Sequence, residues 1–214
     1  MFIVLEGGEG SGKTTAAHAI KTWLAEKNLK VIHTREPGGT PDGETIRGVL
    51  LSEKSQLSPI AQTLLFAAAR TEHVNKLIKP KIDEGYVVLS DRFVLSTIAY
   101  QGAAGNVPYD FIAQLHRDTT KDFWPTLTIV LDVEPETGIA RSRKRLADEN
   151  LDEGYFENLD IAFHHSVRQA MLDAAKKDDN TVVIDASGTI EQVTQRITDA
   201  LERSLVMPDT KEDT

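Results

Sequence analysis

The segment that most constrains this chain runs from residue 2 to residue 15. The short apolar run Phe2-Ile3-Val4-Leu5 leads directly into Glu6-Gly7-Gly8-Glu9-Gly10-Ser11-Gly12-Lys13-Thr14-Thr15, and a helical pattern follows. This order predicts a buried strand, a phosphate-binding loop of the G-x-x-x-x-G-K-[ST] type and a helix. The alternative, a glycine-rich turn that only joins a strand to a helix, is disfavoured because Gly12-Lys13-Thr14 stands at the strand exit.

The chemistry of such a loop comes from its backbone. Glycines let successive N–H groups turn towards phosphate oxygens, and the helix N-terminus adds its dipole. We expect Lys13 to reach the terminal phosphates and the Thr14 hydroxyl to hold Mg²⁺. The expected nucleotide-binding residues here are Gly7, Gly8, Glu9, Gly10, Ser11, Gly12, Lys13, Thr14 and Thr15.

Composition narrows the class of protein. With 214 residues we expect a single domain over residues 1–207 and a disordered polar tail over residues 208–214. Cysteine is absent, no apolar run reaches membrane-spanning length, and no leader precedes the first strand, so we expect a cytoplasmic protein without a membrane partner. The net charge of −9 argues against nucleic acid as a partner.

Strand and helix patterns alternate along the chain. This alternation predicts an α/β fold with a parallel sheet. The expected strands cover residues 2–5, 30–34, 86–90, 128–133 and 181–185, and helices are expected over 96–101 and 109–117 with a loop over 102–107. Ligands of open parallel sheets lie beyond the carboxyl ends of the strands, so Arg35, Asp91 and Arg92 should face the crevice that holds the phosphate loop.

Two further segments leave alternatives open. The helix expected from Ser58-Pro59 towards Ile78 is apolar on more than one stripe, which fits either an interior helix of a monomer or a helix covered by a partner subunit. The basic cluster over 140–146 and the acidic stretch over 148–154 form either a solvated helix end or a lid. The phosphate loop favours a lid at about residues 141–156.

Several motifs together resemble the bacterial type of the thymidylate kinase family. They are the phosphate loop with Glu9 and Gly10, the segment Thr34-Arg35-Glu36-Pro37-Gly38-Gly39-Thr40, the pair Phe66-x-x-x-Arg70, and Asp91-Arg92-Phe93-x-x-Ser96-x-x-Ala99-Tyr100-Gln101. The resemblance implies a five-stranded parallel sheet flanked by helices, in the architecture of P-loop nucleoside monophosphate kinases. It also implies transfer of the γ-phosphoryl group of MgATP to dTMP, giving dTDP, in a homodimer.

The resemblance assigns roles to residues of the acceptor site. Phe66 would stack on thymine, Arg70 would bond its carbonyl edge, and Ser96 and Gln101 would make further base contacts. Tyr100 would crowd the sugar C2′ position, and Glu9 would accept from the 3′-OH. The remaining acceptor residues would grip the acceptor phosphate or line its loop, and these are Arg35, Arg92, Pro37 and the weaker candidate Arg47.

On the ATP side the resemblance assigns Asp91 and Thr14 to Mg²⁺, with Asp91 acting through water. Arg145 would lie against adenine with Arg141 and Arg143 beside it. The residues expected to take part in catalysis are Lys13, Arg92, Arg143 and Arg145.

The chain departs from the family pattern at two positions. Phe93 replaces the usual tyrosine of Asp-Arg-Tyr, and Tyr155 stands where enzymes with Gly at the position of Gly10 supply a lid arginine. Either Arg141, Arg143 or Arg145 takes over this charge, or the enzyme is slow.

Three alternative functions compete with the resemblance. The chain could phosphorylate another deoxynucleoside monophosphate or a 5-modified deoxyuridylate. A GTPase switch would need an Asn-Lys-x-Asp motif, which Asn75-Lys76-Leu77-Ile78 does not provide. The third alternative, a nucleotide sensor without turnover, is supported only by Tyr155.

Overall fold

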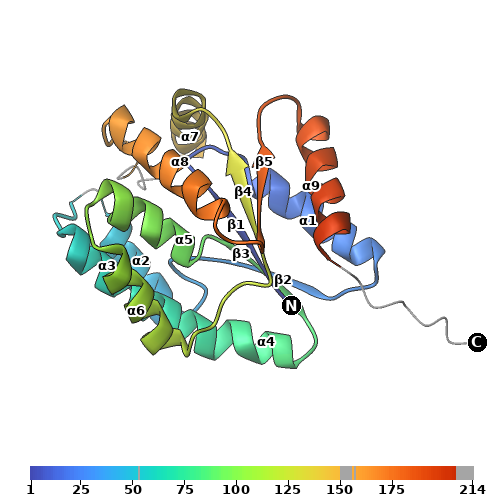
Figure 1. Cartoon of the computed structure of the whole chain (residues 1–214), viewed down its shortest axis with the longest axis horizontal. Coiled ribbons are helices and arrows are strands. Elements are labelled where there is room, and N and C mark those ends of the chain that lie inside the picture. The colour runs from blue at the N-terminus through green and yellow to red at the C-terminus, as the bar shows by residue number, and fades with distance from the viewer. Residues whose placement is uncertain (53, 150–155, 157, 206–214) are drawn as a thin grey trace, which may run out of the picture.

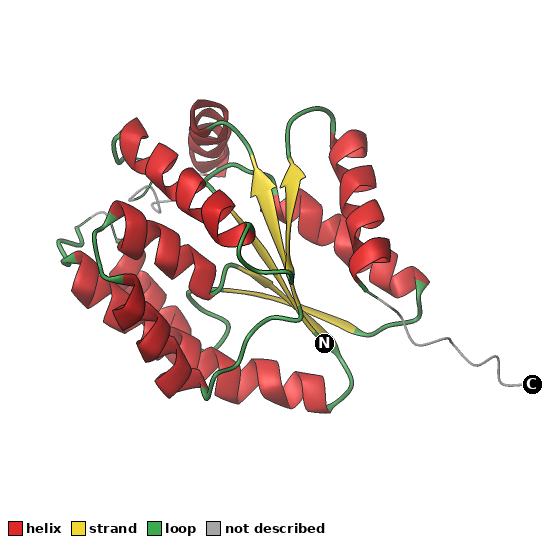
Figure 2. Ribbon diagram, in the orientation of Figure 1, coloured by secondary structure: helices red, strands yellow, loops and turns green. Residues whose placement is uncertain are grey.

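The computed structural model describes residues 1–52, 54–149, 156 and 158–205. Tyr155, part of the expected lid and the expected tail lie outside the described residues. Five strands form one parallel sheet in the order β2-β3-β1-β4-β5, which confirms the predicted α/β fold (Figures 1 and 2). The strands are β1 (Phe2–Gly7), β2 (Val31–Arg35), β3 (Val87–Asp91), β4 (Leu127–Asp132) and β5 (Thr181–Asp185).

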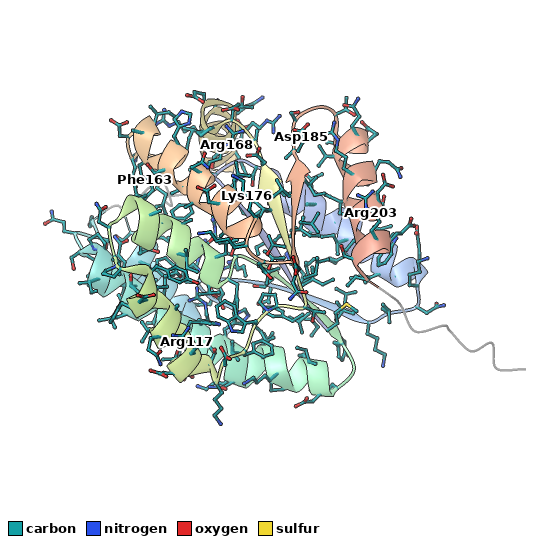
Figure 3. The ribbon with its side chains drawn as sticks, in the orientation of Figure 1. Arg117, Phe163, Arg168, Lys176, Asp185 and Arg203 are labelled. Carbon is teal, nitrogen blue, oxygen red and sulfur yellow. The ribbon has the colours of Figure 1, made fainter. Side chains whose placement is uncertain are left out.

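Helices cover both faces of this sheet (Figure 1). Helices α1 and α9 pack on one face, and α4, α5, α6 and α8 pack on the opposite face. Arg168 joins α8 to the end of β4 through two bonds to Asp132, of 2.7 and 3.1 Å (Figure 3). The helices are α1 (Lys13–Glu26), α2 (Pro41–Leu51), α3 (Pro59–His73), α4 (Lys79–Asp83), α5 (Val94–Thr97), α6 (Tyr109–Thr120), α7 (Pro135–Glu149), α8 (Ile161–Ala175) and α9 (Ile190–Ser204).

Strand β1 is the centre of the core. Its side chains alternate between the two faces, so Ile3 and Leu5 pack with α1 and α9 while Phe2 and Val4 pack on the other side. All four are at most 1% exposed, and burying each such side chain stabilises the fold by about 1.5–3 kcal/mol. The phosphate loop therefore starts from a strand that is buried along its whole length.

Strands β1, β2 and β3 extend slightly beyond their predicted ends at the carboxyl edge, whereas β4 ends one residue earlier than predicted and β5 ends as predicted. Strands β2 and β3 start and end one residue later than predicted, and β1 continues to Gly7. Asp91 is thus the last residue of β3, paired in register with Leu5 and Arg35. The extension brings this carboxylate to the sheet edge where the loop begins.

The predicted loop over residues 102–107 is wrong in its first half. A π-helical turn, Ile98–Ala104, continues directly from α5. Ala103 and Ala104 favour helix and carry it past Gly102. The turn buries Tyr100 and Gln101 at 5% and 2% exposure, on the side of the sheet that carries the site.

Helix α3 is not an interior helix of the monomer. Ala67 and Ala69 are buried on its inner side, but Ile60 and Leu64 remain 44% and 49% exposed. Within this chain, α3 is therefore buried on one side only, and not on the two sides that its apolar pattern predicted. No helix within the described ranges is long and apolar enough to cross a membrane.

Acid should destabilise the fold through His116 of α6. Its ring is 2% exposed, its Nε2 lies 3.0 Å from the Phe123 carbonyl oxygen, and it packs against Phe93 and Trp124. Burial, with a smaller contribution from Arg70, lowers the pKa of His116 from 6.5 to about 4. Between these values the unfolded chain takes up a proton that the native state does not.

The free energy of unfolding should therefore fall as pH decreases from 6.5 to about 4, by about 3 kcal/mol from this residue. Urea unfolding at several pH values measures the slope. In the variant His116→Phe, which cannot titrate here, the slope over this window should be shallower, whereas an equal slope would contradict the assignment. A comparison at pH 8, where the ring is neutral in both states, gives the reference for the cost of the substitution itself.

Candidate functional site

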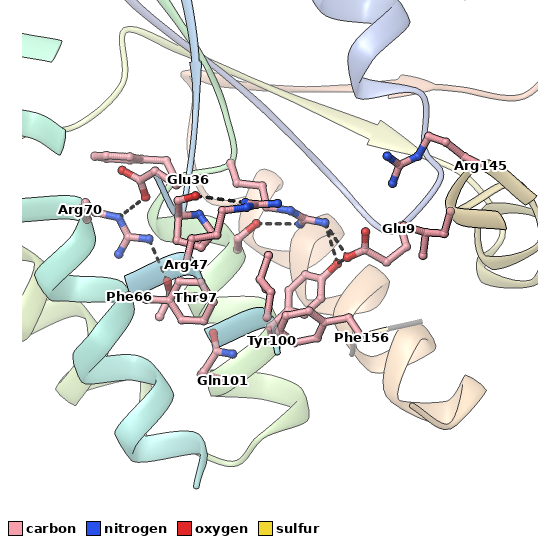
Figure 4. Close-up of a pocket in the computed structure, with 16 residues that line it drawn as sticks. Glu9, Glu36, Arg47, Phe66, Arg70, Thr97, Tyr100, Gln101, Arg145 and Phe156 are labelled. Carbon is pink, nitrogen blue, oxygen red and sulfur yellow. Dashed lines mark hydrogen bonds and ion pairs between the residues drawn. The ribbon is translucent and has the colours of Figure 1, made fainter. Parts of the chain in front are cut away.

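Two cavities meet at the carboxyl ends of β1, β2 and β3. The wider one, about 720 Å³, lies over the phosphate loop, and the narrower one, about 120 Å³, lies between α3 and the helical segment over residues 94–104. Five charged residues line both cavities, namely Glu9, Glu36, Arg47, Arg92 and Arg145. The two cavities therefore adjoin at these charged groups, and Figure 4 shows the residues that line the narrower one.

The phosphate loop has the expected strand-loop-helix context. Gly12 precedes α1 with φ of 94°, a left-handed conformation that favours glycine. The Lys13 ammonium group donates to the carbonyl oxygens of Gly7 and Gly8, at 3.0 and 2.9 Å. Burial, and then the neighbouring Arg92, lower the pKa of Lys13 to about 8. An anionic ligand would offset both effects.

Helix α7 touches the phosphate loop backbone to backbone. A Cβ atom at Gly10 would overlap the carbonyl oxygen of Gly138, and a Cβ atom at Gly138 would overlap the carbonyl oxygen of Glu9. Two glycines facing each other therefore set the distance between the loop and the helix that carries Arg141 and Arg145.

Glu9, Arg92 and Tyr100 form a bonded cluster at the junction of the cavities. The Arg92 guanidinium donates to Glu9 at 2.7 Å and to the Tyr100 hydroxyl at 3.2 Å, and that hydroxyl donates to Glu9 at 2.8 Å (Figure 4). Burial raises the pKa of Glu9, but Arg92 and Lys13 outweigh it and lower the pKa to about 2. Glu9 therefore remains ionised and holds Arg92 in place.

Sequence reasoning assigned no role to Glu6, which fixes the turn that carries Arg92. Its carboxylate is fully buried and accepts from the Phe93 amide at 2.8 Å and from the Ser96 amide and hydroxyl at 3.1 and 2.6 Å. Arg92 itself has φ of 68°. Burial raises the pKa of Glu6. The available signal was a carboxylate ending a wholly apolar strand, because a buried charge requires partners.

The narrow cavity contains the predicted base-binding residues. Phe66 and Pro37 line its wall, and Arg70 and Gln101 are bound to neighbours there. Arg70 donates to Glu36, and the Gln101 amide donates to Gln62 at 3.0 Å. Sequence reasoning missed six other residues that line this cavity, which are Glu36, Leu51, Phe93, Thr97, Leu146 and Phe156.

Ser96 lies in this cavity but faces the phosphate side. Its hydroxyl donates to Glu6 and accepts from Arg92 at 3.0 Å. This contact favours a part in positioning Arg92, while its predicted base contact stays a prediction.

The other predicted arginines differ in their surroundings. Arg35 lines the wide cavity and pairs with Glu44 at 3.0 Å, and Arg47 donates to the Pro37 carbonyl oxygen at 3.1 Å. Arg141 and Arg145, one helical turn apart on α7, line the wide cavity. Arg143 lies on the same helix but is not among the described residues that line either cavity.

Thr14 and Asp91, predicted to serve Mg²⁺, line the same wide cavity. Asp91 Oδ1 lies 3.1 Å from His33 Nε2, and the Asp91 side chain is 21% exposed. Within the described part of the chain no three His, Cys, Asp or Glu side chains form a metal cluster. Oxygen donors of this kind suit Mg²⁺ that arrives with nucleotide phosphates.

Comparison with known proteins agrees with this geometry. The family model described as thymidylate kinase matches residues 5–197. A thymidylate kinase of Cereibacter sphaeroides is 48% identical over 202 residues, covering 94% of this chain and 93% of the relative, and that of Symbiobacterium thermophilum is 42% identical over 207 residues, covering 96% and 94%. The crystal structure of thymidylate kinase from Ehrlichia chaffeensis has a TM-score of 0.74 and 34% identity, covering 94% of this chain and 98% of the other. The chain therefore belongs to the thymidylate kinase family.

Proposed function

We propose that this protein transfers the γ-phosphoryl group of MgATP to dTMP and releases dTDP and ADP. The observation that carries the proposal is the meeting of two cavities at Glu9 and Arg92, one over a phosphate loop and the other lined by Phe66 and Arg70. The relatives named thymidylate kinase support the same acceptor.

The reaction needs no general base. A monophosphate has its second pKa near 6 and is already a nucleophile at neutral pH. The protein has to bring two mutually repelling phosphates into line and stabilise the charge that develops between them. Lys13 in the phosphate loop and Arg92, which is bonded to Glu9, line the same cavity and would supply cationic groups to the two phosphates.

The proposed roles follow the two cavities. ATP phosphates would bind the loop over residues 7–15, with Arg141 and Arg145 along the wall of the same cavity. The acceptor would bind Phe66, Arg70, Tyr100, Gln101 and the phosphate ligands Arg35, Arg47 and Arg92.

The lid stays a proposal that rests on α7. Arg145 lines both cavities, which supports it as the residue that supplies the charge absent at Tyr155. We rank Arg143 lower, because it lines neither cavity among the described residues.

Mg²⁺ would be held by the Thr14 hydroxyl and, through water, by Asp91. When bound, the ion neutralises charge on the phosphate oxygens. His33 holds one oxygen of Asp91 at 3.1 Å and so orients the carboxylate for this task.

The acceptor preference tests the proposed function. Purified protein with MgATP should release ADP fastest with dTMP and much more slowly with dCMP, dGMP and ribo-TMP in a coupled assay. Comparable turnover with dUMP and its 5-modified forms would change the assigned substrate but leave the proposed mechanism in place. The absence of turnover with every acceptor would favour the sensor alternative.

We also propose a homodimer formed through α2 and α3. Val49 on α2 and Ile60 and Leu64 on α3 are 51%, 44% and 49% exposed, an apolar group on neighbouring helices. Such an assembly would act in the cytoplasm, where ATP is available.

Leu64→Glu should convert the dimer to a monomer in sedimentation velocity, because it places a charge in the centre of this apolar surface. The matched control is Ile161→Glu, which changes an equally apolar, 40% exposed residue at the start of α8. A dimer that persists in Leu64→Glu, or that is lost equally in both variants, would contradict this interface.

A further inference from the structure

A chain of buried polar groups runs from β2 to the base cavity. Thr34 Oγ1 lies 2.8 Å from His73 Nε2, and His73 Nδ1 lies 3.0 Å from Glu36 Oε1. Glu36 Oε2 accepts from Arg70 Nε at 2.8 Å, and Arg70 Nη2 donates to Thr97 at 2.9 Å (Figure 4). His73, Glu36 and Arg70 are 0%, 5% and 3% exposed, so water does not compete for these bonds.

These hydrogen bonds determine which nitrogen atom of Arg70 faces the cavity. Its Nε and Nη2 atoms are occupied by Glu36 and Thr97. Its planar guanidinium group lies over Phe93, with Cζ 5.2 Å from the centre of the ring. Within the described part of the chain no hydrogen bond involves Nη1, and Arg70 lines the narrow cavity. A guanidinium group only donates, so this atom favours a base with a carbonyl group and disfavours one with an amino group there.

His73 holds Glu36 in the orientation that this arrangement needs. Oε1 of Glu36 is bound by His73, and no other bond to this atom is seen among the described residues. Arg47 and Arg92 line the same cavities as Glu36. Without His73 the carboxylate would be free to turn towards these arginines, releasing Arg70 and competing with the acceptor phosphate.

The imidazole ring is itself fixed by the neighbouring loop. A Cβ atom at Gly39 would lie 2.5 Å from two atoms of the His73 ring and 2.7 Å from Thr34 Oγ1. The loop backbone therefore packs directly on the ring, and the same loop carries Glu36 and the cavity residue Pro37.

We propose that His73, supported by Thr34, is a positioning residue that sets nucleobase specificity by holding Glu36 so that Arg70 presents its Nη1 donor to the base. The inference rests on the proposed function for its substrate. The inference extends the proposed function to residues that do not touch the base.

Steady-state kinetics with dTMP and dCMP test this role. In His73→Leu the KM for dTMP should rise, and the ratio of kcat/KM for dTMP over dCMP should fall by about tenfold or more, because a charge-assisted contact is lost. The KM for ATP should stay unchanged. His73→Asn is the matched variant, since its side-chain amide can donate to Glu36 from the position of Nδ1, and it should retain most of the preference.

A purely structural role would give a different result. It would lower kcat for both acceptors and leave their ratio within about twofold of the wild type, and this outcome would overturn the proposal. If His73→Leu does not fold, Thr34→Val provides a second test because it removes only the hydroxyl group. It should lower the ratio of kcat/KM for dTMP over dCMP to a smaller extent, and an unchanged ratio in this variant would also overturn the proposal. Wild-type protein without preference for dTMP would defeat the proposed function first, whereas a preference that persists in the variants defeats only the positioning role.

Discussion

Replacing Lys13 by alanine should lower the turnover of phosphoryl transfer by about 10²- to 10³-fold, the size of effect expected when one charged donor to a developing anion is removed. The Lys13 ammonium group is held over the loop by the carbonyl oxygens of Gly7 and Gly8. No other described residue of the loop carries a positive charge. Single-turnover measurement of dTDP formation gives the rate of the chemical step directly.

The same variant should bind dTMP almost as the wild type does. Lys13 lines the wide cavity but not the narrow one, so calorimetric titration with dTMP should give a Kd within about twofold. Lys21→Ala, on the exposed side of the same helix, is the control for the loss of a lysine from α1. A loss of dTMP binding as large as the loss of turnover would mean that the two subsites are wrongly assigned.

Arg92→Ala, unlike Lys13→Ala, should act mainly on acceptor binding and weaken the affinity for dTMP by at least about tenfold. Charged hydrogen bonds contribute about 1.5–3 kcal/mol each. The substitution also leaves the half-buried Glu9 carboxylate without its ion pair to Arg92 Nη2, at 2.7 Å. An unpaired carboxylate at the junction would repel the acceptor phosphate, which adds to the loss.

Two further variants separate these contributions. Arg92→Lys keeps the charge but loses the planar fork that reaches Glu9, Ser96 and Tyr100, so its affinity for dTMP should lie between those of the wild type and Arg92→Ala. Arg117→Ala removes an exposed arginine from α6 and should leave dTMP binding unchanged. If calorimetry gives Arg92→Ala the wild-type affinity, Arg92 is not a phosphate ligand.

The sequence was most informative where a function depends on neighbouring residues. The strand, the phosphate loop and the start of α1 lie within residues 2–15, and the local pattern predicted all three. The alternation of strands and helices predicted the parallel sheet, with ends that differ by a residue or two. Strand pairing decided these ends, as at Asp91, which pairs with both Leu5 and Arg35.

Contacts between distant residues could not be predicted in the same way. Glu6 and Ser96 are separated by 90 positions, and Glu36 and His73 by 37. Glu6 was conspicuous as a carboxylate ending an apolar strand, but its partner Ser96, like the partnership of Glu36 with His73, becomes visible only when the fold brings the segments together. The resemblance assigned residues that would touch a substrate, and the groups that orient them became visible in the tertiary structure.

The paired glycines at the loop and α7 restrict how this chain could change over evolutionary time. Because a side chain at Gly10 would overlap the backbone at Gly138, a mutation that puts an arginine into the loop would first have to displace α7. Moving a positive charge from α7 to the loop would thus require compensating changes in two segments about 130 residues apart in sequence. Single mutations therefore give this protein no smooth route from one placement of that charge to the other.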